Sequence, residues 1–392
     1  MSEDTTIAEK EIHNTLFYCN FFIRNIGLSF IDEIPTTYAR KIIVFSSFVV
    51  VFCFLVLLLL GQIIFIIILM VNSVSVEQFI GGSNLHVFGY GIMCFGKLLT
   101  LWYKKNTFRQ VVKELADIWP IVETNPEVVI IKDNSLKTLR SREIVMLHLY
   151  RLARGTPSNL GLVWRLYYPF DATKPFIHEF VYVFEIISGF ACVCCMLGSD
   201  IFFISMTNHI SMLLRLLQDK IKSLGQEDER GSIIQPLDCY DEIVAVVQIH
   251  QRLIRYANDL EDAFSAVNLI NVLLSSVNIC CVMFNIVFLD PLMEVSNKLF
   301  LGAALTQMGI VCWYADEIYR ASIGVSDAVY ESGWYNCNIR CRRALLLMLQ
   351  RSQRPLYFTA LKFNTITLNT YRSVLTTSYS YFTLLYTSYR QD

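Results

Sequence analysis

The stretch FTALKFNTITLNTYRSVLTTSYSYFTLLYTS, residues 358–388, carries the strongest structural signal in the chain. It is long enough to cross a bilayer as a helix, yet hydroxyl side chains stand where a lipid-facing helix carries Leu, Ile, Val and Phe. Positions three and four apart share a helix face, and one such row is wettable except at a single leucine: Thr370, Ser373, Thr377, Ser380, Leu384 and Thr387. This pattern is typical of a helix that lines a water-filled path. The alternative is a helix buried among others, with its hydroxyls bonded to carbonyls one turn back.

The composition places the chain in a membrane. Of its 392 residues, 54% are hydrophobic and 17% are charged, and the mean hydropathy is +0.44, whereas soluble domains are typically about one quarter charged. A net charge of −1 argues against a nucleic-acid partner, because nucleic-acid-binding domains carry a basic face. The sequence therefore predicts an all-α polytopic membrane protein.

Six stretches before residue 358 are candidate membrane spans: 42–71, 79–103, 143–165, 176–206, 264–289 and 299–318. An amphipathic helix is expected over 238–262, ahead of the fifth of them, and an N-terminal patch, Leu16–Ile31, is expected to lie on the membrane or pack on the bundle. Arg40 and Lys41 precede the first span, which puts the N-terminus in the cytoplasm. With the last stretch as the seventh span, the C-terminus lies outside. The third span is short, basic and interrupted by Gly155 and Pro157, so either it is re-entrant or it marks a truncation.

Four segments follow from this reading. Residues 1–40 are a cytoplasmic segment, 41–335 a transmembrane bundle with cytoplasmic helices, 336–355 a basic cytoplasmic helix, and 356–392 the final helix with a short extracellular end. Glu185 lies within the fourth span, and a carboxylate inside a span is by default a functional candidate. His86 in the second span is either a ligand contact or a buried histidine bonded to a neighbouring helix.

No catalytic pattern stands out. The sequence has no Walker signature, no Gly-x-Ser-x-Gly elbow and no His-x-x-Glu-His spacing. The cysteines sit mostly in apolar runs, where a thiol behaves as a small hydrophobe. We therefore expect neither an enzyme nor a protein that holds a metal or cofactor.

Several motifs resemble those of the insect odorant receptors, over nearly the whole chain. The most specific is Thr377-Ser378-Tyr379-Ser380-Tyr381-Phe382-Thr383-Leu384-Leu385, which is similar to that family's C-terminal signature. Leu356 to Phe363 is similar to the stretch that opens the family's final helix, and Tyr168-Pro169-Phe170-Asp171 to the loop before its fourth span. The spacing of further residues also matches the sixth span and its cytoplasmic exit: Cys312, Trp313, Glu317, Ser322, Tyr330 and Trp334.

The resemblance implies a ligand-gated non-selective cation channel in the plasma membrane of sensory neurons. It implies a heterotetramer with a co-receptor, a small volatile organic ligand, surrounding membrane lipid and an inverted seven-span bundle. By this resemblance the final helices of the subunits line one pore, and the signature places the pore constriction near Tyr381, Phe382 and Leu385. The hydroxyl row instead predicts a constriction at Leu384, with Ser380 and Thr377 on the same face. Candidates for the ligand pocket, assigned by position on the second, fourth and sixth spans, are His86, Phe88, Tyr90, Tyr182, Phe184, Ile187, Leu305 and Met308.

Three alternatives remain open at the level of the sequence. A gustatory receptor of the same superfamily would share the pore and bind a tastant. A truncated, non-functional receptor isoform would account for the short third span, since the family has a full crossing there. A metabotropic receptor or a transporter would not need a pore-lining final helix.

Overall fold

The computed structural model of the chain describes residues 10–29, 38–72, 85–119, 130, 132–137, 139, 166–170, 176–225, 239–288 and 291–391. The regular secondary structure within these ranges is helical apart from one small hairpin, which confirms the all-α prediction. The predicted third span, 143–165, lies outside the described residues, and its nature stays a prediction.

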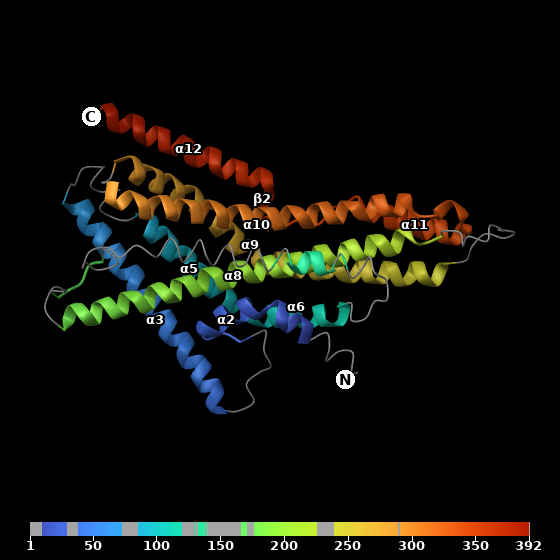
Figure 1. Ribbon diagram of the computed structural model, residues 1–392, viewed down its shortest axis with the longest axis horizontal. Coiled ribbons are helices and arrows are strands. Elements are labelled where there is room, and N and C mark those ends of the chain that lie inside the picture. Colours follow the sequence, from blue (N-terminus) through green and yellow to red (C-terminus); the bar gives the residue numbers. More distant parts are fainter. Residues whose placement is uncertain are drawn as a thin grey trace.

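The long helices α8, α9 and α10 form the frame of the molecule and run side by side along its length (Figure 1). Helices α3 and α12 lie towards one end of this frame, and α11 lies at the other. The elements are α2 (Phe17–Asn25), α3 (Tyr38–Val71), α5 (Leu85–Tyr103), α6 (Lys105–Ile118), α8 (Ile177–Lys222), α9 (Tyr240–Phe288), α10 (Pro291–Glu331), η1 (Trp334–Asn336), α11 (Ile339–Ser352), β1 (Thr359–Ala360), β2 (Asn364–Thr365) and α12 (Leu368–Gln391).

Five described helices are long and apolar enough to cross a membrane: α3, α5, α8, α9 and α10. The chain is therefore a multi-pass membrane protein. Helix α12 is not in this group of described helices, because its hydroxyl side chains lower its hydropathy. Its 24 residues nevertheless extend over about 36 Å, more than the roughly 30 Å of hydrocarbon in a bilayer.

Two helices that the sequence analysis separates are continuous. The amphipathic helix expected over 238–262 and the span expected over 264–289 form the single helix α9. No glycine or proline lies between Tyr240 and Phe288 to interrupt the backbone hydrogen bonds. A membrane span and its polar extension are therefore one rigid element.

The final helix begins later than predicted. We expected it to start near Phe358, but β1 and β2 pair as a tight antiparallel hairpin and α12 starts only at Leu368. The turn depends on Leu361 and Lys362, which adopt positive φ angles of 47° and 63°. The hairpin is fixed to α9 by a hydrogen bond of 3.2 Å from the Leu361 amide to the Ser265 carbonyl.

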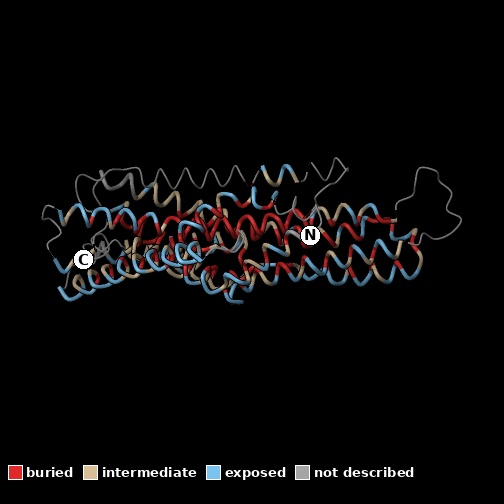
Figure 2. Tube along the Cα trace, turned by 90° about the horizontal axis from the view of Figure 1, so that it is seen from below, coloured by how far each residue is buried: buried red, intermediate tan, exposed pale blue. Residues whose placement is uncertain are grey.

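Aromatic side chains form the centre of the core. Phe108 of α6 packs against Phe202 and Phe264, with ring centroids 5.2 and 5.1 Å apart. Phe203 lies 5.1 Å from Phe264 and 4.9 Å from Phe358, which precedes the hairpin. Buried residues follow the middle of the bundle, and α8 contributes the longest buried run (Figure 2). The core therefore joins α6, α8, α9 and the segment that leads into α12.

Helix α2 packs on the bundle, one of the two places expected for the patch Leu16–Ile31. Cys19, Phe22 and Ile23 are buried against α8, whereas Phe17 and Phe21 are exposed on the opposite face.

At the α11 end of the molecule, the turn at Gly225 that ends α8 is hydrogen-bonded to Gly333 and Asn336, which follow α10. The Gly333 amide donates to the Leu224 carbonyl at 2.9 Å, and the Asn336 side chain donates to the Gly225 carbonyl at 3.1 Å. Gly225 has a φ of 68°, and a Cβ there would lie 2.5 Å from the Gly333 carbonyl oxygen. Only glycine permits this close approach.

Candidate ligand pocket and pore helix

Three rings from α5 and α10 form an aromatic layer. The Phe300 ring lies 5.2 Å from His86 and 4.6 Å from Tyr90, both in edge-on geometry. His86 also lies 3.3 Å, Nδ1 to Nδ2, from Asn285 of α9. This arrangement brings together two predicted pocket residues, His86 and Tyr90, and adds Phe300 and Asn285, which the sequence analysis did not identify. Aromatic side chains with few polar partners suit contact with a small, weakly polar organic molecule.

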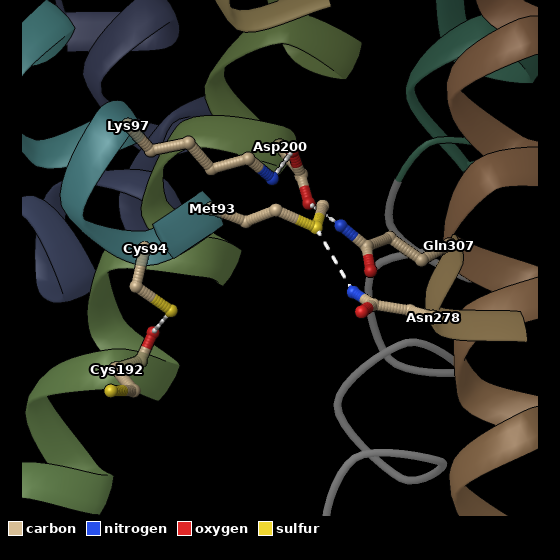
Figure 3. A network of polar contacts seen from close by, with 7 residues as sticks. All are labelled: Met93, Cys94, Lys97, Cys192, Asp200, Asn278 and Gln307. Carbon is tan, nitrogen blue, oxygen red and sulfur yellow. Dashed lines mark hydrogen bonds and ion pairs between the residues drawn. The ribbon is translucent and has the colours of Figure 1, made fainter. Parts of the chain in front are cut away.

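A buried polar cluster lies farther along the same two helices. The Lys97 ammonium is 2.6 Å from Asp200 Oδ1 of α8, and the Gln307 amide of α10 donates to Asp200 Oδ2 at 2.5 Å. Figure 3 shows Lys97 and Gln307 approaching Asp200 from opposite sides. Lys97 and Asp200 are 0% and 3% exposed. The cluster therefore holds α5, α8 and α10 together by charge-assisted hydrogen bonds inside the membrane-spanning part.

Helices α5 and α9 meet at Gly89. The Asn278 amide of α9 donates to the sulfur of Met93 at 3.6 Å, as Figure 3 shows. A Cβ on Gly89 would lie 2.0 Å from Asn278 Oδ1, so the two helices approach closely only because position 89 has no side chain.

Replacing Gly89 by alanine is expected to destabilise the protein by about 1–3 kcal/mol, the usual cost of overpacking a filled site. The added methyl group must displace the buried Asn278 side chain or separate α5 from α9. The measurement is the thermal midpoint of the detergent-purified receptor. The matched control is Gly302→Ala in α10, where an added Cβ meets no heavy atom within 4 Å. Equal thermal midpoints for Gly89→Ala and Gly302→Ala would contradict the close approach of the two helices at Gly89.

The predicted pocket residues of α8 lie elsewhere. Tyr182 and Ile187 are 42% and 44% exposed, and Phe184 stacks on Phe54 of α3 at 5.1 Å. None of their described ring contacts involves the aromatic layer. The buried face of this part of α8 is formed instead by Val181, Glu185 and Ser188.

Glu185 accepts a hydrogen bond of 2.8 Å from the hydroxyl of Tyr168. Burial, together with this bond, raises the pKa of Tyr168, which keeps the phenol protonated as the donor. The neighbouring Tyr167 amide bonds to the Gly61 carbonyl of α3 at 3.3 Å. Glu185 therefore anchors the segment 166–170 between α3 and α8.

The remaining predicted pocket residues lie on α5 and α10. Met308 is buried, and Leu305 and Phe88 are half-buried. Next to Met308, a Cβ on Gly309 would lie 3.4 Å from the ring of Tyr371 in α12. Helix α10 thus contacts α5 and α8 through Phe300 and Gln307, and contacts α12 on its other side.

Helix α12 has one face on the bundle and one face free of it. Thr370, Val374 and Ser378 are buried against α9 and α10. The predicted hydroxyl row begins at this contact and then turns outward: Thr377 is half-buried, whereas Ser373, Ser380, Leu384 and Thr387 are exposed.

Exposure does not separate the two predicted constrictions, because Leu384 of the hydroxyl row and Tyr381 of the signature set are both exposed. Leu384 is 64% exposed and Tyr381 51%. Phe382 and Leu385 are half-buried, and the Phe382 ring packs 6.3 and 6.0 Å from those of Tyr379 and Tyr386.

Several α12 hydroxyls bond to their own helix. Ser378, Ser380 and Thr387 donate to the carbonyls four residues earlier at 2.7, 2.9 and 3.0 Å. The internal bonding predicted by the alternative reading is therefore present. It satisfies the hydroxyl protons, and at the exposed Ser380 and Thr387 it leaves oxygen lone pairs for water.

Known proteins resemble the chain in sequence and in fold. The family model described as 7tm Odorant receptor matches residues 75–379. Odorant receptor 85c of Drosophila melanogaster is 26% identical over 77% of this chain and 81% of its own length. Putative odorant receptor 85d of the same species is 24% identical over 96% and 95%. The structure of the olfactory receptor OR5 from Machilis hrabei in complex with eugenol superposes with a TM-score of 0.82, at 14% identity, over 97% of this chain and 99% of that one. The family match extends from before α5 to within α12, and so includes the aromatic layer and the first three residues of the signature in the final helix. The chain belongs to the insect odorant receptor family.

Proposed function

We propose that the chain is the odorant-binding subunit of a ligand-gated, non-selective cation channel in the plasma membrane of sensory neurons. It acts with a co-receptor subunit in a heterotetramer. The ligand lies against the aromatic layer His86, Tyr90 and Phe300, and α12 of each subunit lines a shared pore.

The position of α10 is the observation that carries this proposal. Phe300 and Gln307 of α10 contact α5 and α8, and Gly309 of the same helix packs at Tyr371 of α12. A ligand that displaces α10 therefore changes the support of α12 directly. The free hydroxyl-bearing face of α12 further supports a role in lining water.

A small volatile organic molecule fits the aromatic layer. The rings of Tyr90 and Phe300 provide mostly apolar contacts. The His86 imidazole, buried beside the Asn285 amide, adds few polar groups, as a weakly polar ligand needs. The Machilis receptor, which shares the fold, was solved with eugenol. A ligand of similar size and polarity suits the aromatic layer of this chain.

The orientation follows from the charges. Basic residues border the start of α3, the end of α8 and α11: Arg40, Lys41, Lys220, Lys222, Arg340, Arg342 and Arg343. Under the positive-inside rule these ends are cytoplasmic. The N-terminus is then cytoplasmic, and α12 leads to an extracellular C-terminus. Residues 336–355, the basic cytoplasmic helix of the sequence analysis, form part of an anchor that joins the subunits on the cytoplasmic side.

Electrical recording tests the proposal. The chain is co-expressed with an insect odorant co-receptor, and a broad odorant panel is expected to evoke cation current that neither subunit gives alone. Surface labelling of the chain is the control for expression. Odorant-evoked current in the absence of the co-receptor, or no current from a surface-expressed pair, would contradict the proposal.

A further inference from the structure

Asp200 fixes the orientation of the Gln307 amide. An ionised carboxylate accepts hydrogen bonds and donates none. Lys97 occupies one oxygen at 2.6 Å, and the Gln307 nitrogen occupies the other at 2.5 Å. The carbonyl end of Gln307 therefore points away from Asp200, as Figure 3 shows. Rotating the amide by 180° would set two acceptor oxygens against each other.

Gln307 is the member of this cluster that an entering molecule meets. Lys97 and Asp200 are buried, whereas Gln307 is half-buried. Its carbonyl oxygen accepts no hydrogen bond from any residue that the structure describes. This oxygen is not among the fully buried, unpaired side-chain atoms of the described residues, so a donor that a bound molecule supplies can reach it. Such a donor replaces water at the oxygen and gains the modest net free energy of one hydrogen bond.

The distance from the aromatic layer to Gln307 suits a small odorant. Phe300 and Gln307 are two turns apart on α10, or about 10 Å along the helix. Ala304, one turn from Phe300 towards Gln307, has only a methyl side chain. A molecule with its apolar body against Phe300 and Tyr90 can therefore place one polar end at the Gln307 oxygen.

We infer that Gln307 is a specificity-determining residue that selects odorants bearing a hydroxyl group, alcohols and phenols, whose O–H donates to its Oε1 atom. The inference rests on the proposed pocket and adds the chemical class of its ligand. An ether of the same shape has no proton to donate and places an acceptor against an acceptor. The cluster thus discriminates hydroxyl compounds from their methyl ethers without using a charged group in the contact.

Binding to the detergent-purified full-length receptor tests the inference without any current measurement. The probes are 1-octanol, 2-phenylethanol and 4-methylphenol, each paired with its methyl ether. Affinities come from the dependence of the thermal midpoint on ligand concentration. We expect each hydroxyl compound to bind about tenfold more tightly than its ether, as one hydrogen bond to an otherwise unpaired acceptor provides.

The variant Gln307→Leu is expected to reduce this preference to less than about twofold, while the Lys97–Asp200 pair keeps the cluster neutral. The matched control is Gln218→Leu, which removes a glutamine on α8 whose amide bonds to the Ala321 carbonyl at 2.7 Å. This control is expected to keep the tenfold preference of the unmodified receptor.

Equal affinities for alcohols and ethers in the unmodified receptor would overturn the inference, even where Gln307→Leu does not fold. A preference that persists in Gln307→Leu would overturn it too, as would an unmodified receptor that none of the three hydroxyl compounds stabilises. A receptor that binds them selectively but conducts no current with a co-receptor would contradict the proposed channel and leave the role of Gln307 intact.

Discussion

Replacing Asp200 by leucine is expected to destabilise the receptor by about 3–5 kcal/mol, the cost of leaving one member of a buried ion pair unpaired. The Lys97 ammonium would remain in the bundle without its counter-charge, 2.6 Å from where Oδ1 now lies. Gln307 would lose its acceptor at the same time. The measurements are the yield of folded receptor by size-exclusion chromatography and its thermal midpoint, and both are expected to fall.

Two variants separate the effect of charge from the effect of side-chain shape. The double variant Lys97→Met with Asp200→Leu removes both charges, and we expect it to recover much of the stability, because apolar replacement of a buried pair is often neutral. Glu331→Leu breaks the ion pair of Lys222 and Glu331, 2.8 Å long and exposed at both ends. That change is expected to have little effect, since surface pairs contribute little. A double variant no more stable than Asp200→Leu would contradict the electrostatic explanation.

The sequence predicted the helices well where hydropathy alone determines them. Long apolar runs in a membrane protein have few alternatives to the helix, because every backbone group must be satisfied within the segment. The predicted start of α12 is wrong, because a hairpin precedes the helix. Its turn places Leu361 and Lys362 in a left-handed conformation that glycine usually adopts, so the sequence does not indicate the turn. The predicted boundary within α9 is also wrong, because a change from polar to apolar residues does not end a helix where no helix breaker is present.

The site was predictable only in part. The prediction that the chain is not an enzyme is confirmed, because the chain belongs to a receptor family. Lys97 and Asp200 could have been paired in advance, since an ionisable residue inside a span calls for a partner. Phe300 and Asn285 could not have been identified as site residues, because the rotation of α10 and α9 about their own axes depends on packing between helices. The rotation of α8 about its own axis is set by packing in the same way, and it places Tyr182 and Ile187 on the exposed side of that helix.

Chemical modification of the free face of α12 is expected to block the channel that we propose. In the variants Ser380→Cys and Leu384→Cys, a positively charged methanethiosulfonate reagent attaches a permanent cation to the exposed face. At an effective dielectric constant of about 20, a unit charge about 4 Å from a permeating cation opposes it by roughly 4 kcal/mol. Since about 1.4 kcal/mol corresponds to a factor of ten, screening still leaves an expected loss of at least about tenfold in odorant-evoked current.

The control positions come from the other face of the same helix. Val374 and Ser378 are buried against α9 and α10, so a cysteine at either position is shielded from the reagent and the current is expected to change by less than about twofold. The unmodified receptor, treated in the same way, accounts for native thiols such as the exposed Cys53 of α3.

Block at positions 380 and 384 but not at 374 and 378 would assign the Leu384 row to the pore. Block confined to cysteines introduced at Phe382 and Leu385 would instead assign the pore to the neighbouring face, which the signature motif indicates. Because both rows belong to one rigid helix, the comparison determines the rotation of α12 about its axis in the assembled channel.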